Sequence, residues 1–167
     1  MEQDENNIPQ LIVMVGIPGV GKSTWIRNFL SNNREQYSVV STDDIIEDFA
    51  QGEGKTYDDV FNKYIKRASN LIQENAKREF KNRNNVIWDQ TNLSVKSRRK
   101  ILQLFPDEYY KIAVAFEPVD MDEIWKRLEK RSMESGKTIP THVIQSMIKN
   151  YAPPTKDEGF DKVIIKQ

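Results

Sequence analysis

LIVMVGIPGVGKSTW, residues Leu11 to Trp25, is the stretch that decides the fold of this chain. It opens with a continuous apolar run, 11–15, which is typical of a strand buried on both faces of a parallel sheet. The glycine-rich residues 16–21 predict a tight loop, and the residues from 22 onward predict a helix. The stretch therefore predicts a strand, a loop and a helix in direct succession.

The loop and the first helical residues match the pattern G-x-x-x-x-G-K-[ST] at residues 16–23. Glycines let successive backbone N–H groups turn toward phosphate oxygens, and the helix N-terminus adds partial positive charge. In this pattern Lys22 bridges the β- and γ-phosphates, and the hydroxyl of Ser23 coordinates Mg²⁺. We therefore predict a site for a nucleoside triphosphate with Mg²⁺. Its predicted residues are Gly16, Gly19, Val20, Gly21, Lys22, Ser23 and Thr24.

The alternation of apolar runs and helical segments continues along the whole chain. It predicts βαβ units, and hence an α/β fold with a five-stranded parallel sheet and helices on both faces. The predicted strands are 11–15, 37–41, 85–89, 110–116 and 162–167. The predicted helices are 22–32, 43–51, 57–83, 94–104, 120–132 and 140–151.

The length of 167 residues suffices for one core, so we expect a single domain over 10–167. The polar residues 1–9 predict a disordered N-terminal lead. A polar, glycine-containing break, SMESGKT (132–138), separates two predicted helices, and a mobile lid can lie there. We place this lid at about 127–140.

The composition excludes several classes of function. Lys plus Arg (25) balances Asp plus Glu (25), so any polyanion must be held by a local basic patch. The chain has no cysteine, which excludes disulfides, thiolate metal sites and a cysteine nucleophile. Neither a signal peptide nor a membrane-spanning run is present, which predicts a cytoplasmic protein without a membrane partner, in the host cytoplasm if the chain is viral.

Two acids, Asp43 and Asp44, follow the second predicted strand in VVSTDDIIEDF. Ligands of open α/β sheets gather outside the carboxyl ends of the strands, so these carboxylates are expected near the γ-phosphate. Asp43 is nearer the strand end and is the candidate general base for an attacking hydroxyl, with Asp44 as a substrate ligand. The alternative is that both acids only stabilise the start of a helix.

A third motif, VIWDQTNLSVKSRRK, begins at the end of another predicted strand. An acid there can hold Mg²⁺ or position a substrate, and the loop after it supplies hydrogen-bond donors. The alternatives are an Asx turn and a solvated basic helix face. The predicted substrate ligands are Asp89, Thr91, Asn92 and Arg98, with Asp89 also predicted to bind the metal.

In a fourth motif, DEIWKRLEKRSMESGKT, Arg127 and Arg131 lie four residues apart on one side of a predicted helix. Two guanidinium groups leading into a flexible loop suit the neutralisation of charge on a transferring phosphoryl group. The alternative is an exposed helix face with pairs such as Glu123 and Arg127.

Taken in order, GIPGVGKSTW, STDD, DQTNLSVKSRR, KRLEKR and IPTHVIQSM resemble the kinase domain of the phage polynucleotide 5′-hydroxyl kinase family, over roughly residues 10–151. The resemblance implies a P-loop kinase fold with a small helical lid. It implies transfer of the γ-phosphate of a nucleoside triphosphate to the 5′-hydroxyl end of DNA or RNA, in nucleic-acid end repair.

Carried over by position, the resemblance makes Lys22 and Ser23 the ligands of the phosphates and Mg²⁺, and Asp43 the general base. Arg131 resembles the lid arginine that clamps the phosphates, with Arg127 as its partner. The phage kinases have an arginine three residues beyond the catalytic aspartate, where this chain has Ile46. A D-x-D-G-T motif is missing, so no 3′-phosphatase activity is expected.

Other functions stay open from the sequence. A small-molecule kinase similar to the zeta-toxin kinases, which phosphorylate a nucleotide-sugar hydroxyl, would use the same Lys22, Asp43 and Arg131. A non-enzymatic NTPase switch is a further alternative. No N-K-x-D guanine-reading motif occurs, which favours ATP over GTP. The sequence does not rank DNA against RNA, single-stranded against recessed ends, or monomer against oligomer.

Overall fold

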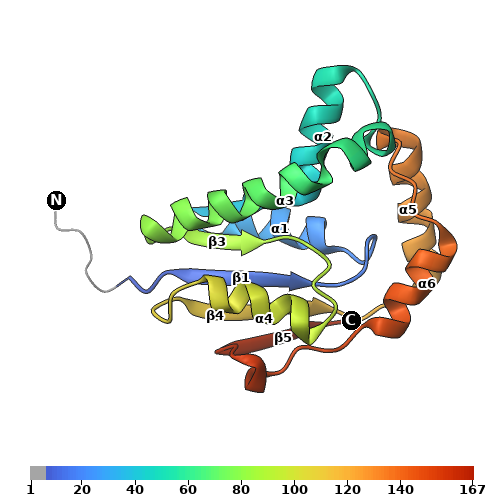
Figure 1. Ribbon diagram of the computed structural model, residues 1–167. Helices are drawn as coiled ribbons and strands as arrows, with labels where there is room; N and C mark the ends of the chain where they lie inside the picture. The colour runs from blue at the N-terminus through green and yellow to red at the C-terminus, as the bar shows by residue number, and fades with distance from the viewer. Residues whose placement is uncertain (1–6) are drawn as a thin grey trace.

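The structure, a computed structural model, describes residues 7–167 (Figure 1). Most of the predicted disordered lead, residues 1–6, lies outside the described residues. Its last residue, Pro9, is buried, and the carbonyl of Pro9 accepts a hydrogen bond from the backbone N–H of Tyr110 at 2.8 Å. The lead was therefore predicted at least one residue too long, because Pro9 already belongs to the packed structure.

Five strands form one sheet in the order β2-β3-β1-β4-β5. The strands are β1 (Gln10–Val15), β2 (Tyr37–Val40), β3 (Asn85–Trp88), β4 (Tyr110–Phe116) and β5 (Lys162–Lys166). Every neighbouring pair is parallel, so all five strands end at the same edge of the sheet. The predicted five-stranded parallel sheet is confirmed, and the glycine-rich loop follows its central strand.

Helices cover both faces of this sheet. The α-helices are α1 (Lys22–Asn32), α2 (Thr42–Glu53), α3 (Tyr57–Lys81), α4 (Val95–Leu104), α5 (Met121–Ser135) and α6 (Thr141–Asn150), and a 3₁₀ turn, η1, spans Lys156–Glu158. Leu11 and Val13 of β1 pack with buried residues of α3 and α4, whereas Ile12 and Met14 pack with Ile26 of α1. Alternate residues of β1 thus face opposite helical layers, as a doubly covered strand requires.

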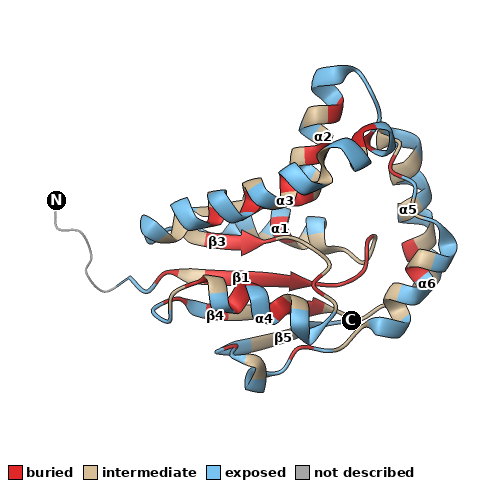
Figure 2. Ribbon diagram, in the orientation of Figure 1, coloured by how far each residue is buried: buried red, intermediate tan, exposed pale blue. Residues whose placement is uncertain are grey.

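Helices α5 and α6 lie beyond the carboxyl ends of the strands, on the right of Figure 1. They are anchored by a small cluster of Ile17, Ile124 and Ile144, and most of their remaining surface is exposed (Figure 2). Helix α5 runs three residues further than predicted, to Ser135, and ends at Gly136 in a left-handed conformation. The predicted break 132–138 is therefore half helical, because the polar residues after Arg131 continue the helix.

Helices α2 and α3 pack against each other through a separate buried cluster. Ile46 has no exposed surface in this cluster, where it packs with Tyr57 and Val60. Helix α2 begins at Thr42 because Ser41 caps it, accepting a hydrogen bond from the backbone N–H of Asp44 at 3.3 Å.

Within residues 7–167, none of the helices combines the length and the apolar character that crossing a bilayer requires.

Candidate active site

The glycine-rich loop, residues 16–23, is called the phosphate loop below. Helix α1 begins at Lys22 with Gly21 as its N-cap, and no side chain caps its first turn. Lys22 is folded over the loop, with its Nζ donating to the carbonyls of Gly16 at 2.6 Å and Ile17 at 3.0 Å. An uncapped helix N-terminus with a lysine beside it is the arrangement that binds phosphate groups.

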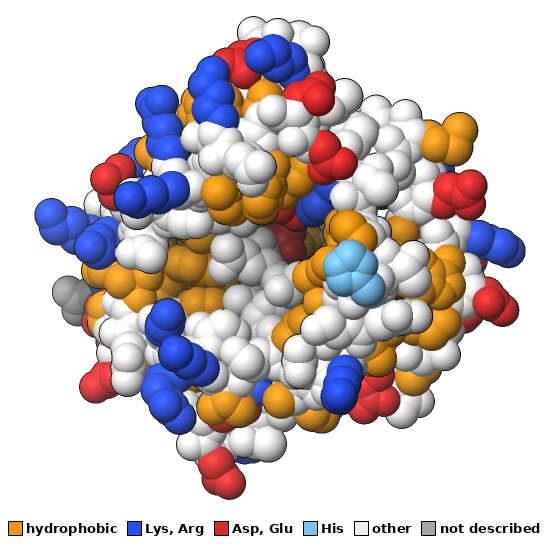
Figure 3. Space-filling model, turned by 45° about the vertical axis from the view of Figure 1, so that its right-hand side comes forward, with side chains coloured by type: hydrophobic (Ala, Val, Ile, Leu, Met, Phe, Trp, Pro, Cys, Tyr) orange, Lys and Arg blue, Asp and Glu red, His pale blue; other side chains and the backbone are white. Residues whose placement is uncertain are grey.

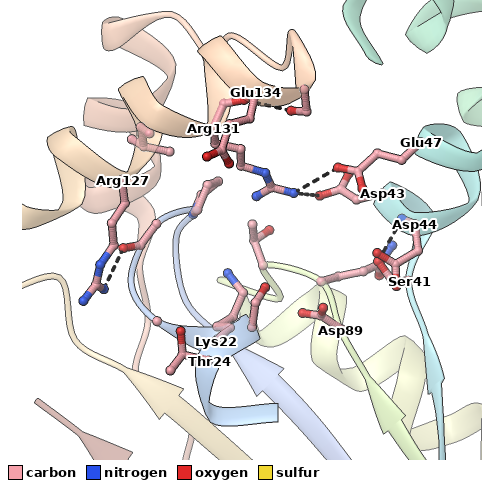
Figure 4. Close-up of a pocket in the computed structure, with 18 residues that line it drawn as sticks. Lys22, Thr24, Ser41, Asp43, Asp44, Glu47, Asp89, Arg127, Arg131 and Glu134 are labelled. Carbon is pink, nitrogen blue, oxygen red and sulfur yellow. Dashed lines mark hydrogen bonds and ion pairs between the residues drawn. The ribbon is translucent and has the colours of Figure 1, made fainter. Parts of the chain in front are cut away.

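A cavity of about 390 Å³ opens above the phosphate loop (Figure 4). This loop cavity collects eleven of the residues predicted from the sequence: Gly19, Gly21, Lys22, Ser23, Thr24, Asp43, Asp44, Asp89, Thr91, Arg127 and Arg131. Gly16 is buried beneath the loop, and Val20 packs against the apolar cluster under α5. The loop, both strand-end acids and both arginines therefore meet at one place.

The charges in the loop cavity shift one another's protonation. Burial lowers the pKa of Lys22 to about 8, although the negative charge of Asp89 opposes the shift. Burial raises the pKa of Asp89, with Lys22 opposing and Asp43 adding to the rise. The pKa of Asp44 is raised by burial and by the nearby carboxylates of Asp89 and Glu47. One lysine and several acids thus share a partly buried site and shift one another's pKa values, which is a frequent property of catalytic centres.

Asp43 lies at the centre of the polar contacts. Its Oδ1 accepts a hydrogen bond from the hydroxyl of Tyr57 at 2.7 Å, and its Oδ2 accepts one from Nζ of Lys137 at 2.5 Å. Arg131 points at the same region, with its Nη2 3.8 Å from Oδ2 of Asp43 and 3.5 Å from Oε1 of Glu47 (Figure 4). Both carboxylate oxygens of Asp43 therefore already have a protein donor.

These partners decide the ionisation of Asp43. Burial alone would raise the pKa of Asp43, but the charge and hydrogen bond of Lys137, the hydrogen bond of Tyr57 and the charge of Arg131 together lower it. The pKa of Tyr57 is raised by burial and by its hydrogen bond to Asp43, so its phenol stays protonated and remains a donor. Asp43 is therefore ionised at neutral pH.

Lys137 and Tyr57 were not identified from the sequence. Lys137 stands in the polar turn between α5 and α6, 94 residues from Asp43, and only 8% of its surface is exposed. Its Nζ also lies 4.8 Å from the centre of the Tyr57 ring. A lone lysine in a polar break carries no signal of its own, because only the docking of that turn brings it to the acid.

The docking of this turn depends on close contact with the start of α3. A β-carbon added at Gly136 would lie 2.5 Å from Cβ of Thr56, so the backbone of Gly136 packs against the side chain of Thr56 at a distance that only a glycine permits. The next contact is a hydrogen bond from the backbone N–H of Thr138 to Oδ2 of Asp58 at 2.9 Å. Lys137 lies between these two contacts and is thereby directed to Asp43.

A second cavity, of about 760 Å³, lies on the other side of Asp43. Its walls are mostly apolar or uncharged and include Phe61, Leu93, Val143 and Met147. Figure 3 shows the molecule hollowed at this face, with hydrophobic side chains around the hollow and acidic atoms at its depth. The two cavities share Pro18, Asp43, Asp89, Gln90 and Thr91. Asp43 and Asp89 therefore line the passage between them.

The loop after β3 connects the two cavities to the central strand. The carbonyl of Thr91 accepts a hydrogen bond from the backbone N–H of Gly16 at 2.9 Å. The side-chain amide of Asn92 donates to the carbonyl of Met14 at 2.8 Å, and Asn92 itself has a left-handed backbone with φ 47°. Asn92 is 4% exposed, so its amide is used to hold the loop in place.

Arg98 does not lie in either cavity, and the predicted contact with substrate does not fit its position. Its side chain is fully buried, with Nε 2.7 Å from Oε1 of Glu158 and Nη1 donating to the carbonyl of Asn92 at 2.9 Å. The predicted substrate contact was wrong because of the side of α4 on which Arg98 lies. Arg98 shares the core-facing stripe of α4 with Ile101 and Leu102, so its guanidinium pairs with a buried acid and fastens η1 to the loop after β3.

Replacing Arg98 with alanine is expected to lower the free energy of unfolding by about 3–5 kcal/mol, because the buried carboxylate of Glu158 loses its cation. Urea unfolding measures this change. The matched control is Arg99→Ala, one residue further along α4, where an exposed side chain is lost and the expected change is within about 0.5 kcal/mol. Equal losses from the two variants would contradict the anchoring role of Arg98.

Arg127 contacts both the phosphate loop and its own helix. Its Nη1 donates to the carbonyl of Gly19 in the phosphate loop at 3.1 Å, and its Nε donates to Glu123 at 3.1 Å, four residues earlier in α5. Arg131, one turn further along α5, faces Asp43 and Glu47. Helix α5 thus presents two guanidinium groups to opposite sides of the loop cavity (Figure 4).

Curated proteins with similar sequences match most of this chain. Mouse heterogeneous nuclear ribonucleoprotein U-like protein 2 is 28% identical over 160 residues, which cover 92% of this chain and 21% of that protein. L-seryl-tRNA(Sec) kinase of Methanococcus maripaludis is 27% identical over 156 residues, covering 90% of this chain and 56% of that enzyme. This chain therefore spans only part of the length of these curated relatives.

Solved structures and a family model agree with the fold. A chain in the structure of the Pnkp1/Rnl/Hen1 RNA repair complex matches with a TM-score of 0.68 and 26% identity, over 90% of this chain and 46% of that chain. The AAA_33 family model, described as an AAA domain, matches residues 11–154. The chain therefore belongs to the AAA_33 family of AAA domains, and its five-stranded parallel sheet and phosphate loop have the P-loop kinase fold.

Proposed function

We propose that this protein transfers the γ-phosphate of ATP to the 5′-hydroxyl end of DNA or RNA. One observation carries the proposal: Asp43 lines both the loop cavity and the second cavity, so one carboxylate faces a phosphate site and a separate site for an acceptor. A general base for hydroxyl attack needs this position between donor and acceptor.

The donor triphosphate would occupy the loop cavity, with its phosphates on the uncapped N-terminus of α1. Lys22 would exchange its two carbonyl contacts for the β- and γ-phosphates. The hydroxyl of Ser23 and the carboxylate of Asp89 line the same cavity, and two oxygen ligands beside substrate phosphates suit Mg²⁺. Bound there, the ion would neutralise charge on the phosphates.

The acceptor hydroxyl would enter from the second cavity. Each carboxylate oxygen of Asp43 keeps a free lone pair beside its protein donor, so it can still accept the hydroxyl proton. The acceptor oxygen forms a bond to the γ-phosphorus while the bond to the β,γ-bridging oxygen breaks. The proton passes to Asp43, and the nucleoside diphosphate leaves.

Residues 127–140 would act as a lid over the transferring group. Arg131 is positioned by α5 above the loop cavity and faces carboxylates that a triphosphate can replace as its partners. In that position it would stabilise the charge of the transferring phosphoryl group. Arg127 already bonds to the phosphate loop and would hold the base of the lid against it.

The shape of the second cavity supports a nucleoside at the acceptor end. Its volume of about 760 Å³ is in the range of sites for drug-sized ligands, and its apolar walls suit a base and a sugar. The RNA repair complex and the seryl-tRNA kinase, which resemble this chain, are named for work on RNA. Ile46 is buried between α2 and α3, so an acceptor phosphate would not be held from that position.

Transfer of label from γ-labelled ATP tests the proposal directly. A DNA or RNA oligonucleotide with a 5′-hydroxyl is expected to take up label, and the same oligonucleotide with a 5′-phosphate is expected to take up none. Running both sugars ranks DNA against RNA. Label on a nucleotide sugar or another small hydroxyl compound, with none on the oligonucleotides at any salt concentration, would overturn the proposal in favour of a small-molecule kinase.

Replacing Lys137 with methionine is expected to move the acidic limb of the pH–rate profile to higher pH. The charge and hydrogen bond of Lys137 lower the pKa of Asp43, so their removal leaves the raising effect of burial opposed only by Tyr57 and Arg131, and the pKa rises. Asp43 acts as a base only when it is ionised. As the pH is lowered, the rate therefore begins to fall at a higher pH in the variant than in the wild type. Lys130→Met is the control, because Lys130 is exposed and pairs with Glu134 of the same helix. An unmoved limb would argue against Asp43 as the titrating base.

A further inference from the structure

Three basic side chains form one exposed face of α4. Arg99 and Lys100 follow Lys96 by three and four residues, so all three side chains occupy the same side of the helix. All three are exposed, whereas Arg98, Ile101 and Leu102 fill the opposite, buried side. The name "α4 basic face" is used below for these three exposed residues.

The α4 basic face carries charge that the described part of the protein does not neutralise. Lys63, Arg83 and Lys130 on other surfaces each form an ion pair with a glutamate. Within residues 7–167, none of the ion pairs involves Lys96, Arg99 or Lys100. Because the net charge of the chain is zero, this face is a local concentration of positive charge rather than part of a basic surface.

The position of α4 connects this face to the second cavity. Ser94 and Ser97, at the start of the helix, line that cavity. Lys96 adjoins Ser97 in the sequence, and Lys100 follows one turn further from the cavity. Figure 3 shows a group of Lys and Arg side chains on the same face of the molecule as the central hollow, below it and to its left. The cations therefore lead outward from the mouth of the acceptor site.

We propose that the α4 basic face binds the backbone phosphates of a polynucleotide strand as it leaves the second cavity. This inference rests on the proposed function, in which the 5′-terminal nucleoside occupies that cavity. The walls of the cavity offer one basic side chain, Lys137, which is already paired with Asp43. The phosphates of the strand must then be held outside it, and a row of exposed cations gives contacts that do not depend on sequence.

A second basic cluster on the surface provides a matched control. Lys77, Arg78 and Lys81 are exposed at the end of α3, which leads into the start of β3 at the opposite edge of the sheet. It has the same composition, two lysines and one arginine, but lies away from both cavities. Removing it changes the net charge equally without touching the proposed strand path.

The experiment compares the wild type with two triple-alanine variants, one for each cluster. Fluorescence anisotropy measures binding of a labelled single-stranded 5′-hydroxyl oligonucleotide of about 15 nucleotides. Label transfer gives KM and kcat for this oligonucleotide and for a dinucleotide, which is chosen to be too short to extend along the α4 basic face. A variant with Lys96→Arg and Lys100→Arg tests whether charge alone suffices, and retained ATP binding shows that each variant is folded.

Loss of the α4 basic face is expected to weaken oligonucleotide binding roughly tenfold at low salt and to reduce the slope of log K against log salt by about 2. The KM for the oligonucleotide should rise similarly, while kcat and the KM for the dinucleotide stay unchanged. The control triple variant and the arginine variant should behave as the wild type.

Outcomes of this experiment separate the inference from the proposed function. Transfer to the oligonucleotide with an unchanged KM in the α4 variant overturns the inference and leaves the function standing. Binding that depends on α4 without transfer of label supports the surface and overturns the function. Equal effects from the α3 control overturn the inference, because they show a response to net charge. If the wild type does not bind the oligonucleotide, both proposals fail.

Discussion

Replacing Asp43 with asparagine is expected to lower the rate of phosphoryl transfer by about 10²- to 10⁴-fold while ATP binding is retained. Asparagine keeps the shape of the side chain. Its single carbonyl oxygen can accept the hydrogen bond from Lys137, and its amide N–H can donate to the hydroxyl oxygen of Tyr57. It cannot take up the hydroxyl proton. The loss should therefore appear in kcat rather than in the dissociation constant of ATP.

Single-turnover label transfer and equilibrium ATP binding measure the two quantities separately. Asp48→Asn is the matched control, because Asp48 lies on the exposed side of the same helix and lines neither cavity. The control should transfer phosphate at the wild-type rate. A variant at position 43 that keeps full transfer would reject Asp43 as the base, and one that loses ATP binding would give it a role in the donor site instead.

Replacing Arg131 with alanine should lower kcat by about 10³- to 10⁵-fold, the effect of removing an arginine that stabilises the transferring phosphoryl group. Its guanidinium has no backbone partner in the phosphate loop, unlike that of Arg127, and its contacts to Asp43 and Glu47 are long. It is therefore free to exchange them for phosphate oxygens. Arg127→Ala should affect ATP binding more and kcat less, because Arg127 holds the loop.

Lys130→Ala provides the control for loss of one positive charge on α5, since Lys130 is exposed and pairs with Glu134. Rates at saturating ATP and acceptor distinguish binding from chemistry for both arginines. A fall of less than about tenfold for Arg131→Ala would leave Arg131 as a surface residue that pairs with Glu47, without a part in transfer.

The strands could be predicted from the sequence because a strand covered on both faces needs apolar residues at nearly every position. The end of α5 could not, since Ser132–Ser135 have no apolar period and the helix stops only at Gly136. The motif at residues 16–23 also predicted the phosphate loop, because the residues of that loop are contiguous in the sequence. These features are local, and local sequence is sufficient for them.

The residues of the candidate site that were missed or misplaced by sequence reasoning are those whose positions depend on tertiary contacts. Tyr57 and Lys137 reach Asp43 from 14 and 94 residues away, and no spacing rule joins them. Arg98 and Arg99 are adjacent and chemically identical, yet one is buried and the other exposed. The helical period of 98, 101 and 102 was the available signal that Arg98 faces the core, and it conflicts with the preference of arginine for solvent.

Gly136 carries no charge, yet its lack of a side chain affects the acid strength of Asp43. Its missing side chain lets the turn rest against Thr56, and Lys137, the next residue, reaches Asp43 from this turn. One added methyl group would push the turn away from α3 and lengthen the Lys137 contact. A mutation that alters no ionisable group would then change the acid strength of Asp43, so basicity in this site is set by steric fit as well as by charge.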